Sequence, residues 1–202
     1  KRTLHKVQQS DRLQRTLYEI ADLASSDLPL GDMLARVHQS IAGLMYAKNF
    51  IVLLCDPNIE TLRIAYLVDE LDPEVYDPER VMAASEIPHC LAVAMMRAGR
   101  PMSGPSRLLK AQFGLLPERG PGPESEDWLG VPLRWNDEMR GALVVQSYDP
   151  AQRFHEADLS LLNFVGQHVV TALERRRARA ELEWQVERRT EELARANQAL
   201  RR

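Results

Sequence analysis

The sequence predicts an α+β domain in which an antiparallel β-sheet is flanked by helices, with a long helix at each end of the chain. Three observations lead to this prediction. Apolar residues repeat at helical spacing near both ends, two pairs of apolar runs between them have the pattern of hairpins, and a charged helical pattern without glycine or proline continues to the last residues. With 202 residues, of which 45% are hydrophobic, the chain can bury the core of one domain of about 150 residues and still carry an extension.

Two helices are predicted before the sheet. Residues 3–24 contain neither glycine nor proline, and Leu13, Leu17 and Ile20 are spaced as on one face of a helix. The segment Ser25-Ser26-Asp27 interrupts this pattern and offers side chains that can cap a second helix. The apolar face of that second helix comprises Leu34, Val37, Ile41 and Leu44.

The next segments predict a first hairpin. Phe50–Cys55 is a continuous apolar run, typical of a buried strand, and Thr61–Val68 alternates as its partner would. Asp56-Pro57-Asn58 between them is a turn signal. We expect Cys55 in the core, because free cysteine is among the most buried residue types. The acidic residues 69–79 are expected to form a loop.

A helical segment and a second hairpin follow. Residues 86–98 predict a helix that ends at Gly99. Residues 106–116 predict a short helix, and 117–127 an exposed loop. The second hairpin comprises Trp128–Trp135 and Met139–Ser147, joined at Asn136-Asp137, with Gly141 marking a bulge or a close backbone approach.

The last predicted helix begins near Glu156, where acidic residues in the first turn suit the helix dipole. If it continues from Asp158 to Arg202, its length is roughly 67 Å, at about 1.5 Å per residue. A compact domain of this size has a radius of gyration of only ~15 Å, so the second half of the helix needs a partner. Heptad spacing predicts a dimer through Leu182, Val186, Leu193 and Leu200.

Composition excludes several classes of protein. The net charge of -3 lacks the basic surplus of a nucleic-acid-binding protein. No apolar run is long enough to span a bilayer, so no membrane insertion is expected, and no signal peptide is recognisable. The two cysteines form no disulfide framework, which favours a cytoplasmic protein with reduced thiols. Because the chain begins without methionine and ends within a helical pattern, we expect it to be part of a longer protein.

Several segments together resemble the GAF domains of bacterial two-component and cyclic-di-GMP proteins. The resemblance covers about Leu13 to Arg175. It implies a sheet of five or six antiparallel strands with the terminal helices on one face and a ligand pocket on the other. The predicted organisation is a signalling helix at residues 1–25, the domain at 26–175 and a coiled-coil connector helix at 176–202. The segments that carry the resemblance are Tyr46–Phe50, Ala65–Glu70, Asp127–Leu133 and Gly141–Ser147, followed by Phe154, Asp158, Leu159 and Leu162.

The resemblance places a pocket between the sheet and the segment Met82 to Trp128. The candidate ligand-binding residues are Met82, His89, Cys90, Phe113 and Trp128. An adjacent thiol and imidazole can be nucleophilic or bind a metal, but adjacent helix positions diverge by roughly 100° and no paired metal-ligand spacing occurs, so no metal is predicted. Trp128 either stacks on a ligand or closes the core. The carboxylates of Asp69-Glu70 and of Glu124–Asp127 are interpreted as parts of solvated turns.

The predicted function is that of a non-catalytic, homodimeric sensory module. It would bind an unidentified small ligand or a partner and relay the signal through its helices to an output domain in the same chain. Residues 187–200 resemble the connectors that precede such domains, and a diguanylate cyclase (GGDEF) domain is the favoured output. A histidine kinase output, a ligand-free dimerisation module and an enzyme of the methionine sulfoxide reductase type remain alternatives, although the last would need more reactive cysteines. No cofactor is assigned.

Overall fold

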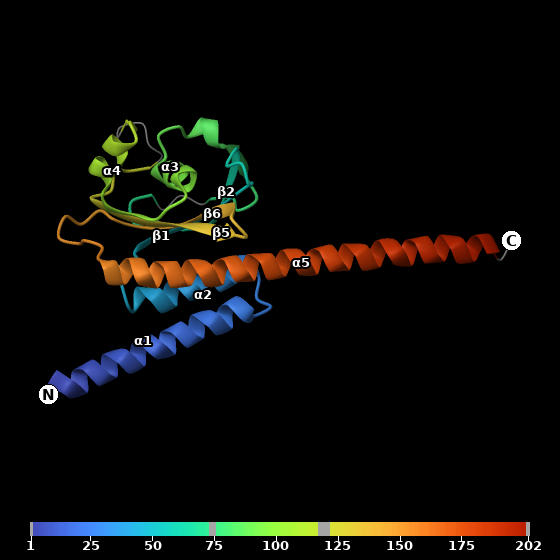
Figure 1. Cartoon of the computed structure of the whole chain (residues 1–202), viewed down its shortest axis with the longest axis horizontal. Coiled ribbons are helices and arrows are strands. Elements are labelled where there is room, and N and C mark those ends of the chain that lie inside the picture. Colours follow the sequence, from blue (N-terminus) through green and yellow to red (C-terminus); the bar gives the residue numbers. More distant parts are fainter. Residues whose placement is uncertain (1, 73–75, 117–121, 201–202) are drawn as a thin grey trace. The chain divides into compact units, whose positions relative to one another are not determined.

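The computed structural model describes residues 2–72, 76–116 and 122–200, with side chains from residue 10 to residue 199 of these ranges. Its contacts divide the chain into two units, Lys1–Val170 and Thr171–Arg202. The first unit contains a six-stranded antiparallel sheet in the order β3-β2-β1-β6-β5-β4 (Figure 1). Its strands are β1 (Asn49–Cys55), β2 (Thr61–Val68), β3 (Val81–Ala83), β4 (Met102–Pro105), β5 (Asp127–Trp135) and β6 (Glu138–Ser147).

Helices cover both faces of this sheet. In Figure 1, α2 and the first turns of α5 lie on one side of the sheet, and α3 and α4 lie on the other. The predicted α+β class is therefore confirmed, with the layering that the resemblance implies. The helices are α1 (Arg2–Ser25), α2 (Leu30–Ala42), α3 (Leu91–Ala98), α4 (Ser106–Gln112) and α5 (Glu156–Leu200), and a 3-10 turn spans Ala84–Glu86.

Small residues allow the elements of the first unit to approach closely. A Cβ atom on Gly166 of α5 would lie 3.2 Å from Leu133 and 3.3 Å from Val131, so the helix rests almost directly on β5. At Gly141, where φ is +156°, a Cβ would lie 1.9 Å from the carbonyl oxygen of Leu53 on β1. The predicted close approach at Gly141 is thus confirmed, and only glycine fits there.

Both hairpins form where they were predicted. Asn136 and Asp137 join β5 to β6 with φ values of 48° and 64°, the left-handed conformations that a two-residue hairpin turn requires. Gly99 ends α3 in the left-handed conformation, as expected of a C-terminal glycine.

Other boundaries differ from the prediction. The helix expected over 86–98 begins only at Leu91, because Pro88 and the turn around it precede the first helical residue. The N-cap residue of α2 is Pro29, not Ser26 or Asp27, and the Ser26 hydroxyl donates to the carbonyl of Leu23 at the end of α1. The strands β3 and β4 were not predicted, because segments of three and four residues are too short to show a period.

The second unit continues α5 as a highly charged helix. Ion pairs four residues apart, such as Arg179–Glu183 and Arg188–Glu192, follow its surface and contribute about 0.3–0.5 kcal/mol each. Three of the predicted dimer residues, Leu182, Val186 and Leu193, are 62–65% exposed. The fourth, Leu200, lies outside the residues whose side chains are described. Among the described residues, no helix is both long and apolar enough to cross a membrane.

His38 of α2 makes the stability of the fold dependent on pH. Its ring stacks on Phe50 with centroids 4.6 Å apart, and its nitrogens contact the hydroxyl of Tyr66 and the carbonyl of Ala47. Burial lowers the pKa of His38 below its usual 6.5, although the Ala47 carbonyl acts in the opposite direction. The unfolded chain then binds more protons, so this contribution to stability is present above pH 6.5 and is lost as the pH falls below it.

We expect His38→Gln to flatten the dependence of the melting temperature on pH between about 7.5 and 5.5. Glutamine keeps polar atoms near Tyr66 and Ala47 but does not titrate. His168 remains in the variant, and because burial lowers its pKa as well, it contributes a slope of the same sign that must be subtracted. An unchanged slope after the substitution would contradict the assignment to His38.

Candidate functional site

A cavity of about 340 Å³ lies on the side of the sheet that faces α3 and α4. Its floor is apolar, with Ile51 and Leu53 from β1 and Val144 from β6. These side chains point away from the face that α2 covers, because successive residues of a strand alternate between faces. A space of this size, apolar with a few polar groups, suits a small molecule.

Trp128 forms one wall of the cavity and is only 4% exposed. Its position depends on Gly130 two residues later, because a Cβ there would lie 2.3 Å from the indole ring and 2.9 Å from the sulfur of Met95. The glycine therefore allows the indole to fold back along β5 toward α3. In this position Trp128 could stack on a ligand or close the core, so both predicted roles are compatible with the structure.

Asp69 forms a polar end of the cavity directly after β2. Its side chain accepts hydrogen bonds at Oδ1 from the backbone N–H groups of Leu71 and Asp72, at 2.9 and 3.1 Å. At Oδ2 it accepts from Gln146 Nε2 and from the Tyr148 hydroxyl, at 2.9 and 2.8 Å. Asp69, Asp72, Gln146 and Tyr148 all line the cavity. Burial and then the Asp69 carboxylate raise the pKa of Tyr148 far above its usual value, so its hydroxyl stays a donor.

A second polar region lies between α4 and the segment before β5. Lys110 is buried and forms an ion pair with Glu124 at 3.0 Å. The hydroxyls of Ser106 and Ser125 hydrogen-bond at 2.6 Å. Lys110 and both serines line the cavity, and the ion pair neutralises the charge of Lys110 within the protein.

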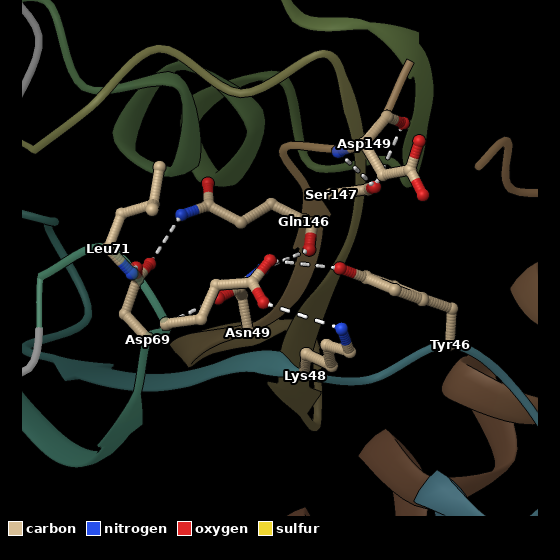
Figure 2. Close-up of polar contacts among 9 residues, drawn as sticks. Tyr46, Lys48, Asn49, Asp69, Leu71, Gln146, Ser147 and Asp149 are labelled. Carbon is tan, nitrogen blue, oxygen red and sulfur yellow. Dashed lines mark hydrogen bonds and ion pairs between the residues drawn. The ribbon is translucent and has the colours of Figure 1, made fainter. Parts of the chain in front are cut away.

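Hydrogen bonds lead from the region of Asp69 to Tyr46 (Figure 2). The fully buried Asn49 donates to the backbone carbonyl of Gln146 at 2.9 Å and accepts from the N–H of Glu70 at 2.8 Å. The Glu70 carboxylate in turn accepts from the Tyr46 hydroxyl at 3.1 Å. The Tyr46 ring packs edge-on against Phe154, two residues before α5 begins.

Phe154 also contacts β5, the strand that carries Trp128. The carboxylate of the neighbouring Asp127 accepts a hydrogen bond from the N–H of Phe154 at 2.7 Å. Phe154 therefore contacts both Asp127, the neighbour of the cavity-lining Trp128, and Tyr46, which is hydrogen-bonded to Glu70 beside Asp69.

Comparison with known proteins identifies the family. The family model described as GAF domain matches residues 30–175. The chain belongs to the GAF domain family. A search of curated proteins gives no match for this GAF domain.

Solved structures with the same fold include other GAF domains. One, from an Acinetobacter phosphoenolpyruvate-protein phosphotransferase, has a TM-score of 0.65 and 21% identity, over 82% of this chain and 95% of that chain. A second, from a putative sensor histidine kinase of Pseudomonas syringae pv. tomato, has a TM-score of 0.57 and 18% identity, over 89% and 99%. A third, the phycocyanobilin-bound GAF domain of a cyanobacterial phytochrome, has a TM-score of 0.57 and 14% identity, over 84% and 96%. At these identities the comparisons show the fold alone.

The structure places four of the five candidate ligand-binding residues of this GAF domain at one cavity. Met82, His89, Cys90 and Trp128 line it; Phe113 does not, although it packs against the apolar cluster to which Cys90 and Trp128 belong. His89 Nδ1 accepts the N–H of Leu116.

Sequence reasoning missed much of the polar lining. Asp69, expected in a solvated turn, is only 8% exposed, and Asp127, also expected there, is buried at the start of β5. Both interpretations were wrong for one reason. An aspartate in or beside a turn has the same sequence neighbours whether it is solvated or buried, and only the fold shows that distant segments exclude water from it.

The thiols of this GAF domain are not activated. Cys55 is half-buried and packs against the core cluster, and burial together with the Asp56 carboxylate raises its pKa to about 11. Cys90 lines the cavity, and burial raises its pKa as well. In the described part of the chain, no three histidine, cysteine, aspartate or glutamate residues are grouped as metal ligands would be.

We therefore expect both cysteines to react slowly with Ellman's reagent at pH 7.5. Roughly one Cys55 thiol in a few thousand is ionised at that pH, and the thiolate is the nucleophile. Unfolding in urea should make both thiols react at the rate of a free cysteine. A fast-reacting thiol in the folded protein would instead favour redox chemistry.

Proposed function

We propose that this GAF domain is a non-catalytic sensory module that binds a small ligand in the cavity and relays its presence through α5. One observation carries the proposal: a cavity of about 340 Å³, with apolar walls and fixed polar groups, is linked to Phe154 at the start of α5. A ligand that binds one arrangement of these contacts better than another shifts the population toward it.

Native mass spectrometry of freshly purified protein tests for a ligand that stays bound. The expected result is an added mass that disappears on denaturation. Ala92→Phe, which places a ring in the cavity, should abolish the added mass while the protein still melts cooperatively. If no mass is retained and no compound of a metabolite library raises the melting temperature, the alternative of a ligand-free dimerisation module is favoured.

We further propose that the chain forms a parallel homodimer through the exposed side chains of Leu182, Val186 and Leu193. Leu182→Glu and Val186→Glu, combined in one variant, should shift sedimentation equilibrium from dimer to monomer at tens of micromolar. Trp184→Glu is the matched control, because Trp184 is equally part of α5 but lies outside the heptad seam. A monomeric parent protein, or an equal effect of the control, would contradict the proposed seam.

The output is proposed to be a diguanylate cyclase (GGDEF) domain, in line with the resemblance of residues 187–200 to connector helices. Similarity to the GAF domain of a sensor histidine kinase supports the kinase as the second candidate. In the full-length protein, inserting four residues between Leu182 and Leu193 rotates the two ends by roughly 40° at about 3.6 residues per turn. A relay predicts altered output activity, whereas a passive tether predicts none.

A further inference from the structure

We infer that the ligand of this cavity carries a cationic N–H group, such as an ammonium or amidinium, on an apolar body. The inference rests on the proposed function and adds the chemical class of the ligand. The cation would lie at the Asp69 end of the cavity, beside Asp72 and Gln146, with the apolar body along β1, β6 and Trp128.

The first reason is the uncompensated charge of Asp69. This carboxylate is nine-tenths buried, and its four hydrogen bonds come from two backbone N–H groups, an amide and a hydroxyl, all neutral. Within the described ranges, no lysine, arginine or histidine forms an ion pair with it. Neutral donors satisfy its lone pairs but leave its negative charge in the cavity wall.

The second reason is that the polar atoms beside Asp69 that remain available to a ligand, the side-chain oxygens of Gln146 and Asp72, are hydrogen-bond acceptors. Both hydrogens of Gln146 Nε2 are used, one toward Asp69 and one toward Tyr148. The amide orientation is therefore determined, and Figure 2 shows its oxygen pointing away from Asp69. No donor from the described chain contacts this oxygen or the half-buried carboxylate of Asp72.

The carboxylates of Asp69 and Asp72 both lie near the Tyr148 hydroxyl. Asp69 and Asp72 both raise the pKa of Tyr148, after burial, because both place negative charge near its hydroxyl. This end of the cavity thus combines two carboxylates, an amide oxygen and a phenol oxygen. Charge-assisted hydrogen bonds to such acceptors are about twice as strong as neutral ones.

The cationic side chains that line the cavity, Lys110 and Arg80, do not remove the preference for a cationic ligand. Lys110 is neutralised by Glu124 at 3.0 Å in the other polar region. Arg80 lies in an exposed part of the lining, where solvent screens its charge. A metal ion is a poorer occupant than an organic cation, because the described residues offer no group of three metal-ligating side chains.

Three probes of nearly equal shape test the inference by titration calorimetry: phenylpropylammonium, phenylpropanol and phenylpropanoate. We expect the ammonium compound to bind about tenfold more tightly than either other probe, a difference of about 1.4 kcal/mol. Asp72→Asn should reduce this preference without weakening binding of the alcohol, because it removes one of the two carboxylates. Asp32→Asn, the same charge change on the exposed part of α2, is the matched control and should leave all three affinities unchanged.

Each other outcome overturns the inference in a distinguishable way. Equal or tighter binding of the alcohol or the carboxylate in the cavity contradicts the cationic class but leaves the proposed ligand site intact. A preference that Asp72→Asn leaves undiminished places the cation away from this end of the cavity and also contradicts the inference. If none of the probes binds at millimolar concentration, the inference fails, and the native mass measurement then decides separately whether the cavity binds any ligand.

Discussion

Gly141→Ala is expected to destabilise the domain by about 3 kcal/mol or more, at the upper end of the range for point substitutions. The added methyl carbon would lie 1.9 Å from the Leu53 carbonyl oxygen and 2.9 Å from its carbon. Both atoms belong to the backbone of β1, which pairs with β2 on one side and β6 on the other, so neither can move without breaking a ladder in the centre of the sheet. Alanine is also strained at the φ of +156°.

Thermal unfolding followed by circular dichroism measures this effect. For a domain of this size, 3 kcal/mol lowers the melting temperature by about 6–12 °C. Gly31→Ala is the matched control, because a Cβ added to Gly31, in the first turn of α2, would meet nothing within 4 Å. We expect the control to be neutral or slightly stabilising, since alanine favours a helix over glycine. Similar melting temperatures for the two variants would show that β1 and β6 can separate at little cost.

Asn49→Ala is expected to cost roughly 2–4 kcal/mol. The substitution removes the donor to the Gln146 carbonyl and the acceptor for the Glu70 N–H, at a residue with no exposed surface. Each backbone group left buried without a partner costs about 1–3 kcal/mol. Because Glu70 contacts Tyr46, which packs on Phe154, the loss also disconnects the Asp69 end of the cavity from the start of α5.

Asn49→Asp distinguishes the contributions of the two hydrogen bonds of Asn49, because it changes the donor and keeps the acceptor. Aspartate keeps the acceptor for Glu70 but places a charged oxygen against the Gln146 carbonyl, so at pH 7 it should be at least as destabilising as alanine. Burial raises the folded-state pKa of such a carboxyl, so the folded state takes up a proton as the pH falls and regains a donor. The stability lost in this variant should therefore be partly recovered at pH 5, whereas Asn49→Ala recovers none. Chemical denaturation at both pH values measures the difference, and equal losses would contradict the role of the Gln146 contact.

Features that depend on neighbouring residues in the chain were predictable. The hairpin turn at Asn136-Asp137, the helix end at Gly99 and the constraint at Gly141 each follow from backbone conformations that only a few residue types adopt. The long strands and α5 followed from sustained apolar periods. The strands β3 and β4 escaped prediction because they are edge segments of three and four residues, ordered by pairing with strands far away in the sequence.

The residues of the candidate site likewise include some that the sequence predicted and others that it did not. Met82, His89, Cys90 and Trp128 were predicted through the resemblance, whose order of motifs places this segment over the sheet. Asp69, Gln146 and Tyr148 were not, because their hydrogen bonds join residues 77 and 79 positions apart. Phe113 was predicted because it lies in the segment that covers the pocket in this family; it packs against the apolar cluster but does not line the cavity.

For this protein, the sequence by itself determined the α+β class, the order of the longer elements and the apolar positions of α5, because turn chemistry and periodicity act within a few residues. Only the tertiary structure decided which carboxylates are buried, which polar side chains line the cavity and which residues contact Phe154. These properties depend on the exclusion of water by segments distant in the chain. An aspartate in a turn has the same neighbours in sequence whether it faces solvent or, like Asp69, lines a cavity.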